Sequence, residues 1–287
     1  MHWRLPIGES HGQNMRVALA TSSRILLPLA IQRLSASVSS VHNEHNDGME
    51  NLEPIEAASR VIEELFPGCR DAFLSRSVLT SRRTPTSDLD IVVVLGGPPA
   101  PYRETIRAHG WIVELFVHSR ESLLFFYDFD AQSGTCTLAQ MCADGYVLRS
   151  FAGEATEIQD EARKIIAAGP PALTDEERGN RRYRLTDLLD DFHGSSNSVE
   201  IVFIAGRLVE EAGELALRSE RRWTGASKWL ARHLDAAPDD FANRLAHGLK
   251  SVLSTNDKQP MIETVSAILD LAGGPLTEGF VAFKPVE

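Results

Sequence analysis

Residues 72–94, AFLSRSVLTSRRTPTSDLDIVVV, contain the pattern that decides the fold. The short apolar segment at 72–74 is typical of a buried strand, and the hydroxyl-rich segment at 75–87 predicts a turn and a connector. A second strand is expected at 88–95, because the chain is almost continuously apolar after Asp90. This second strand starts on two carboxylates, and they are the first candidates for a functional site.

Asp88 and Asp90 stand two positions apart, so on a strand both side chains point to the same face of the sheet. Leu89, Ile91 and Val93 then point the other way, into a core. Two neighbouring carboxylates repel each other, and one of them keeps its proton unless a cation lies between them. The pair therefore indicates a site for a hard divalent cation that is bound through oxygen.

A third carboxylate, Glu114, interrupts the apolar segment WIVELFV at residues 111–117, which predicts a third strand. A carboxylate inside an apolar strand is unfavourable unless it is paired or binds a metal. If the third strand lies beside the second, Glu114 converges with Asp88 and Asp90. The oxygen-only ligand set then favours one or two magnesium ions over zinc. The alternative is an edge strand whose acidic residues face solvent.

With this spacing the segment resembles the nucleotidyltransferase superfamily related to DNA polymerase beta. Residues 84–94, TPTSDLDIVVV, are similar to the small-molecule members, including those that inactivate aminoglycosides. The family motif is a Gly-Ser turn, a spacer, Asp-apolar-Asp, and an acidic residue on a later strand. Here ten residues separate Ser77 from Asp88-Leu89-Asp90, and Val113-Glu114-Leu115 supplies the last part. The resemblance covers residues 72–117 well and the later part of the chain loosely.

The resemblance implies transfer of a nucleoside monophosphate from an NTP, such as ATP, to a hydroxyl of a small-molecule acceptor, with release of pyrophosphate. An aminoglycoside-like antibiotic is one such acceptor, the sequence does not specify which small molecule it is, and no nucleic acid template takes part. Asp88, Asp90 and Glu114 are then metal ligands and catalytic residues, and Glu114 helps to deprotonate the acceptor. Ser77 and Ser87 are expected to bind the nucleotide.

Residues 223–230, WTGASKWL, resemble the Lys-Trp element of several small-molecule nucleotidyltransferases. Lys228 would then face the nucleotide's phosphates. In the alternative interpretation, Trp223 and Trp229 are core anchors and Lys228 extends to solvent. The preceding helix carries three glutamates, Glu210, Glu211 and Glu214. One of them is a candidate for the general base or for a contact with a cationic acceptor. In the alternative interpretation, all three are solvated residues on an exposed helix face.

Arg76 departs from the family motif, because it stands where the family has the glycine before the turn's serine. The arginine either crowds the triphosphate or adds a charge-assisted contact to it. Two alternatives to the small-molecule enzyme stay open, and Arg76 bears on the second of them. One is an enzyme that transfers AMP to a Ser, Thr or Tyr of a protein. The other is a nucleotide-binding protein without catalysis.

The expected fold class is an α/β (α+β) nucleotidyltransferase domain with a small mixed sheet, followed by an all-helical C-terminal domain. The first is placed at residues 49–168 and the second at 172–273, because Gly169-Pro170-Pro171 separates them. Residues 274–287 are expected to be a tail. Besides an edge strand at 146–149, helices are predicted at 54–66, 102–108, 119–128, 137–143, 155–168, 174–193, 199–218, 226–234, 238–253 and 260–271.

Residues 1–48 differ from the rest of the chain, since no acidic residue lies between Ser10 and Asn43. That composition resembles a transit peptide. We favour instead a disordered extension or upstream sequence from an over-extended start, because Met49 immediately precedes the first well-patterned helix.

Composition limits the function classes. The chain has 29 Lys and Arg against 40 Asp and Glu, which gives a formal net charge of −11. An acidic protein is unsuited to general nucleic-acid binding, but its charge is compatible with a cationic acceptor. The three cysteines, Cys69, Cys136 and Cys142, fit no zinc spacing and indicate a reducing compartment. No apolar run is long enough to span a bilayer. We therefore expect a cytoplasmic monomer or homodimer without a membrane partner.

Overall fold

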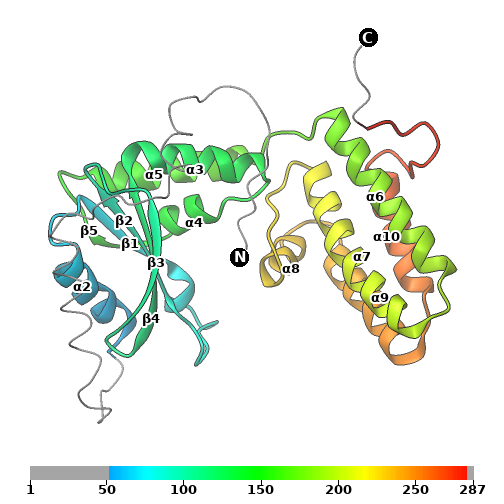
Figure 1. The fold of residues 1–287 in the computed structure, drawn as a ribbon, viewed down its shortest axis with the longest axis horizontal. Coiled ribbons are helices and arrows are strands. Elements are labelled where there is room, and N and C mark those ends of the chain that lie inside the picture. Colours follow the sequence, from blue (N-terminus) through cyan, green and yellow to red (C-terminus); the bar gives the residue numbers. More distant parts are fainter. Residues whose placement is uncertain (1–51, 283–287) are drawn as a thin grey trace, which may run out of the picture. The chain divides into compact units, whose positions relative to one another are not determined.

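The computed structural model describes residues 52–282 of the chain (Figure 1). The predicted extension at 1–48 and the end of the predicted tail, at 283–287, lie outside the described residues. Within residues 52–282, none of the helices combines the length and the apolar character that a membrane crossing needs.

A five-stranded mixed sheet, in the order β3-β4-β2-β1-β5, forms the centre of the first part of the described chain (Figure 1). β1 (Asp71–Leu74) pairs antiparallel with β2 (Leu89–Leu95) and with β5 (Tyr146–Arg149). β2 pairs parallel with β4 (Trp111–Ser119), and β3 (Tyr102–Ala108) pairs antiparallel with β4 at the edge. The predicted small mixed sheet is confirmed, and so is its edge strand β5.

Residues 102–108 form the strand β3, and the prediction of a short helix there is wrong. The physical reason is the turn that follows, in which His109 and Gly110 both have positive φ, 49° and 84°. Ala108 pairs directly with Trp111 across this turn. A two-residue turn with both residues at positive φ joins antiparallel strands, because its twist matches that of the strands.

Helices cover both faces of the sheet (Figure 1). On one face, Leu89 and Ile91 pack against α2 (Pro54–Leu65), as expected for the side chains that point away from the two aspartates. On the other face, Val92 and Val94 belong to a cluster with three further helices. Because both faces are covered, β2 has to be apolar over nearly its whole length. The three helices are α3 (Arg120–Gln132), α4 (Thr137–Ala143) and α5 (Glu154–Ala168).

The rest of the described chain is helical, as predicted. α6 (Asp175–Gly194) starts at the expected capping box, in which the Glu177 N–H donates to Thr174 Oγ1 at 3.1 Å and the Thr174 N–H donates to the Glu177 carboxylate at 2.8 Å. One buried cluster joins α6 to the other four helices. These are α7 (Ser198–Ser219), α8 (Lys228–Asp235), α9 (Phe241–Thr255) and α10 (Gln259–Leu271).

The segment that follows α10 lies along α6. Arg182 Nε donates to the Gly274 carbonyl at 2.7 Å, and the rings of Tyr183 and Phe280 stack with their centroids 4.0 Å apart. These contacts hold Gly274 and Phe280 of the predicted tail against α6, while most of the tail residues between them are exposed. The limits of two separate domains, at residues 168 and 172, stay a prediction.

Candidate metal centre

Strand pairing brings the three predicted carboxylates together. In the parallel pairing of β2 with β4, Asp90 lies directly opposite Glu114. Asp88 stands just before β2, which starts at Leu89 and not at Asp88 as the sequence predicts. Carboxylate oxygens of the three residues lie within 4.8 Å of one another. The convergence expected from the sequence is therefore present.

The surroundings of Asp90 disfavour its negative charge. Burial, which is the largest cause, and the charges of Asp88 and Glu114 together raise the pKa of Asp90 to about 7, while Arg103 acts in the opposite direction. Without a cation, the cluster therefore holds a proton close to neutral pH. A bound divalent cation would take the place of that proton.

The chemistry of the three donors fits magnesium. Asp88, Asp90 and Glu114 offer only carboxylate oxygen, without sulfur or imidazole, which are the ligands that zinc prefers. All three side chains are half-buried, so water has access to complete a coordination shell. Among residues 52–282, no other group of three His, Cys, Asp or Glu side chains is close enough to share an ion.

Arg103 is a site residue that the sequence interpretation missed. It lies on β3, and its Nη2 is 2.5 Å from Oε2 of Glu114. Its position opposite Phe116 in the β3–β4 register places it diagonally across from Glu114. The prediction of a helix at 102–108 concealed it. The signal that would have found it is the His109-Gly110 turn, which predicts a hairpin and so brings Arg103 onto the face of Glu114.

A backbone hydrogen bond joins the predicted phosphate-binding turn to the strand that carries Asp90. The Ser75 N–H donates to the Asp90 carbonyl at 2.8 Å, and the next residues form the short 3-10 helix η3 (Arg76–Leu79). The side chains of Arg76 and Ser77 are both exposed. Ser77 thus lies two residues beyond a direct contact with the strand that carries Asp90.

Ser87 holds the end of the connector beside Asp88. Its Oγ accepts from the Thr84 N–H at 2.9 Å, and its own N–H donates to the Thr84 carbonyl at 3.0 Å. These two bonds shape the turn that leads into Asp88. The hydroxyl therefore has a structural role, besides any contact with a nucleotide.

Lys228 is the first residue of α8, and its side chain is exposed. It forms no hydrogen bond or ion pair with any residue of the described part of the chain. Trp223 is buried, and its Nε1–H donates to the Ile166 carbonyl at 2.8 Å, so it is a core anchor. Trp229 is half-buried, and the Arg232 guanidinium lies over its ring at 4.6 Å.

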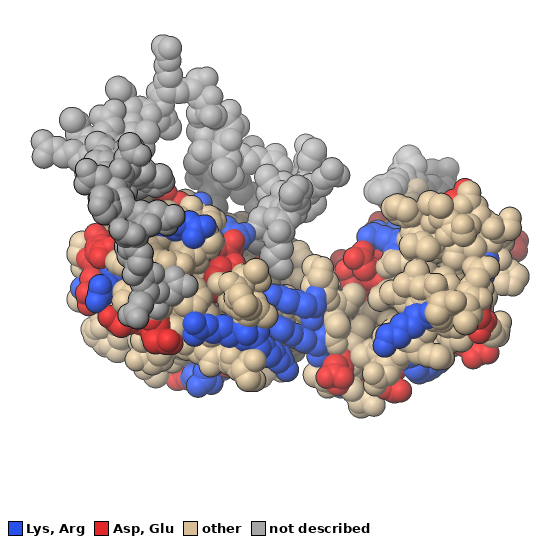
Figure 2. All heavy atoms as spheres, turned by 90° about the horizontal axis from the view of Figure 1, so that it is seen from below, with Lys and Arg blue, Asp and Glu red and all other residues tan. Residues whose placement is uncertain are grey.

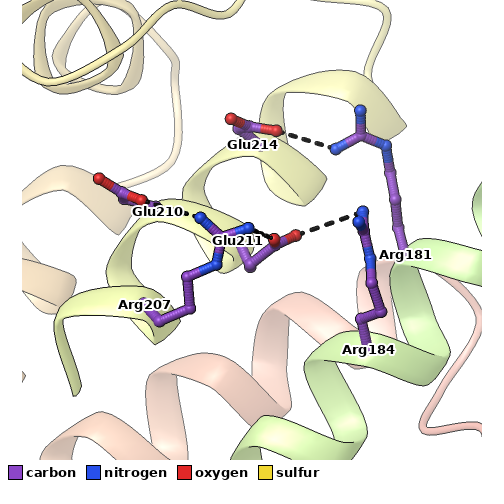
Figure 3. Close-up of polar contacts among 6 residues, drawn as sticks. All are labelled: Arg181, Arg184, Arg207, Glu210, Glu211 and Glu214. Atoms are coloured by element: carbon purple, nitrogen blue, oxygen red, sulfur yellow. Dashed lines mark hydrogen bonds and ion pairs between the residues drawn. The ribbon is translucent and has the colours of Figure 1, made fainter. Parts of the chain in front are cut away.

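The three glutamates of α7 considered for an acceptor contact are paired with arginines (Figure 3). Glu211 is only 7% exposed, and a buried carboxylate needs such partners. Each glutamate therefore has an arginine partner in the structure, and a contact with a cationic acceptor stays a prediction. The pairs are Arg207 with Glu210 at 3.2 Å and with Glu211, Arg184 with Glu211 at 3.5 Å, and Arg181 with Glu214 at 3.0 Å.

His118, which follows Glu114 on β4, is not suited to act as a base here. Burial lowers the pKa of His118 to about 4, and its Nδ1 lies 3.2 Å from Ser122 Oγ. The ring also makes an edge contact with Phe126. His118 is thus a neutral core residue.

Comparison with solved structures finds a similar chain in the crystal structure of a nucleotidyltransferase-like protein from Exiguobacterium sibiricum 255-15. The similarity covers 76% of this chain and 74% of that chain, with 12% sequence identity and a TM-score of 0.41. No protein-family model and no curated protein matches the chain.

Proposed function

We propose that this chain is a nucleotidyltransferase of the polymerase-beta-related superfamily. It would transfer a nucleoside monophosphate from an NTP to a hydroxyl of a small-molecule acceptor and release pyrophosphate. The observation that carries the proposal is the convergence of Asp88, Asp90 and Glu114 within 4.8 Å. Three carboxylates at this distance suit a metal-bound triphosphate, and the strand that carries Asp90 is hydrogen-bonded to a turn with an exposed serine.

In the proposed reaction the acceptor oxygen forms a bond to the α-phosphorus, and the bond from that phosphorus to the bridging oxygen of pyrophosphate breaks. Asp88, Asp90 and Glu114 would hold one or two magnesium ions. Bound there, Mg²⁺ supplies the positive charge that polarises the α-phosphate and aligns the attacking and leaving oxygens. The hydroxyl proton leaves as the new bond forms, and Glu114 is proposed to assist its removal.

The triphosphate is proposed to lie beside η3, with Ser77 donating its hydroxyl to the β- or γ-phosphate. Ser87 keeps the connector in place, and Lys228 is proposed to neutralise the departing pyrophosphate. Figure 2 shows several Lys and Arg side chains close together on part of the visible surface, although the whole chain has a formal net charge of −11. Such a local gathering of cations attracts phosphates.

A screen for pyrophosphate release tests this function. The full chain is incubated with Mg²⁺ and each of ATP, CTP, GTP and UTP, against panels of aminoglycosides, lincosamides and candidate proteins. We expect release with a small-molecule acceptor and none from the Asp90→Asn variant. Labelling of a protein by ATP would instead favour the alternative that modifies Ser, Thr or Tyr.

The presence of Arg76 in the position of the motif glycine favours a second candidate function, which is nucleotide binding without catalysis. Arg76 is exposed on η3. Under that alternative the chain binds an NTP in the presence of Mg²⁺, but no acceptor in the panels produces pyrophosphate. Pyrophosphate release that depends on both Asp90 and an acceptor rules it out.

A further inference from the structure

Arg103 is the cation that contacts the carboxylate centre. Its guanidinium lies 2.5 Å from Glu114, and it also lies over the ring of Phe116, 4.6 Å from the ring centre. Within residues 52–282, no other Lys or Arg forms an ion pair with Asp88, Asp90 or Glu114. In the absence of an added cation, Glu114 is therefore neutralised by the protein itself.

The ion pair between Arg103 and Glu114 is one that a stronger cation can displace. The Arg103 side chain is 37% exposed and that of Glu114 is 24% exposed, and β3 is an edge strand. Ion pairs that water reaches are weak. A divalent ion among three carboxylates gains more electrostatic energy than one guanidinium that touches a single carboxylate.

The strand register keeps Arg103 at the site after such a displacement. Arg103 lies directly opposite Phe116, whereas Thr105 is the residue opposite Glu114. The guanidinium therefore reaches Glu114 diagonally, and its stacking on Phe116 does not depend on that ion pair. Once released from Glu114, the charge stays on the face that carries the carboxylates.

We propose that Arg103 is an internal counter-ion with two alternate partners. It pairs with Glu114 when no metal is bound, a divalent cation displaces it, and it then binds a phosphate oxygen of the nucleotide. This inference rests on the proposed function, because it requires an anionic substrate at the same face. A guanidinium is well suited to this exchange, since its planar donors match carboxylate and phosphate alike.

The consequence is a pair of effects with opposite sign. The ion pair must break before Glu114 can bind a metal, so Arg103 weakens the binding of Mg²⁺ alone by about two- to fivefold. Since the same residue then contacts phosphate, it strengthens the binding of the metal-bound nucleotide. A residue that only supported the fold would not weaken one ligand and strengthen the other.

The test compares wild type with Arg103→Gln in the full chain by isothermal titration. One titration uses Mg²⁺ alone, and the next uses the non-hydrolysable α,β-methylene analogues of ATP, CTP, GTP and UTP with Mg²⁺ present. We expect Arg103→Gln to bind Mg²⁺ about two- to fivefold more tightly and the best analogue roughly tenfold more weakly. Circular dichroism and melting curves verify that the variant is folded.

Arg107→Gln is the matched control, because Arg107 is exposed, lies on the same strand and shares the face of Arg103. It removes the same charge without removing the ion pair, so each affinity should change less than about twofold. Arg103→Lys keeps the charge without the planar donors and should bind Mg²⁺ with an affinity between those of wild type and Arg103→Gln.

Two results would contradict the role of Arg103 without contradicting the metal centre. One is an affinity of Arg103→Gln for Mg²⁺ that is equal to or lower than that of wild type. The other is an affinity of Arg103→Gln for the analogue that is not lower than that of wild type. Absence of Mg²⁺ binding in wild type and in every variant would overturn the metal centre and this inference together. The two failures are therefore distinguishable in one set of titrations.

Discussion

Asp90 on β2 and Glu114 on β4 lie directly opposite each other across a parallel strand pair. The same register continues through Ile91 opposite Leu115 and Val92 opposite Phe116, within buried parts of the sheet. The separation of the two carboxylates is therefore set by backbone hydrogen bonds in the core, and not by a loop. A site built in this way is suited to hold a cation in fixed geometry.

Replacing Asp90 by Asn should abolish nucleotidyl transfer and leave the protein folded. A metal ligand is lost, and since metal ions contribute several kcal/mol to such transition states, activity should fall by roughly a thousandfold or more. Asp88→Asn should have a similar effect. Pyrophosphate release measures activity, and circular dichroism verifies the fold. Unchanged activity in both variants would rule out the proposed mechanism.

The contribution of Asp90 to the stability of the metal-free protein should fall as the pH rises from about 4 to about 7. The pKa of Asp90 is about 7 in the folded protein and about 3.9 in an unfolded chain. Between these values the folded state holds a proton that the unfolded state lacks, so the free energy of unfolding falls with rising pH. Urea unfolding in EDTA at several pH values measures this.

The comparison with Asp90→Asn isolates this contribution, because other groups titrate in the same range. Burial lowers the pKa of His118 to about 4, which gives stability the opposite slope between about 4 and 6.5. At pH 8 the metal-free variant should be more stable than wild type by about 1 to 3 kcal/mol, and at pH 4 the two should be nearly equal. A wild type that is more stable than the variant at pH 8 would contradict this.

The three carboxylates of the site could be predicted because the sequence patterns that indicate them are local. Asp88 and Asp90 are two residues apart on an apolar strand, and Glu114 is the single acidic residue in an apolar segment. Both patterns follow from the alternation of side chains along a strand and from the penalty for burying a charge. Only the pairing of β2 with β4 had to be assumed.

Arg103 is harder to predict than the carboxylates, because its role depends on the partner strand. Residues 102–108 are half-exposed or exposed. Such a segment has no continuous apolar face, and its few apolar positions therefore do not distinguish a short helix from an edge strand. The deciding feature is the backbone of His109 and Gly110, whose positive φ values fix a hairpin. The role of Lys228 likewise depends on long-range placement, and it remains a proposal.

The His109-Gly110 turn should be sensitive to substitution. Gly110 has φ of 84°, so Gly110→Ala should lower the free energy of unfolding by about 1 to 2 kcal/mol. Gly97→Ala is the matched control, since Gly97 has no positive φ and open space around it, and it should change stability by less than about 0.5 kcal/mol. Equal effects in urea unfolding would contradict a turn that requires positive φ.

Arg76 should assist nucleotide binding. Its side chain is exposed on η3, beside the serine expected to contact phosphate. A charge-assisted contact of this kind predicts that Arg76→Ala weakens binding of the Mg²⁺-bound triphosphate analogue by about fivefold or more. Titration calorimetry measures the affinity. Tighter binding in the variant would show instead that the arginine crowds the triphosphate.

The most direct test of the metal centre is a titration of metal-free protein with Mn²⁺, which replaces Mg²⁺ and is followed by electron paramagnetic resonance. We predict saturable binding of one or two ions by wild type, and competition by Mg²⁺. The double variant Asp88→Asn/Asp90→Asn should lose this binding while it stays folded. Binding that is absent from wild type, or equal in the double variant, would contradict a metal centre at these carboxylates.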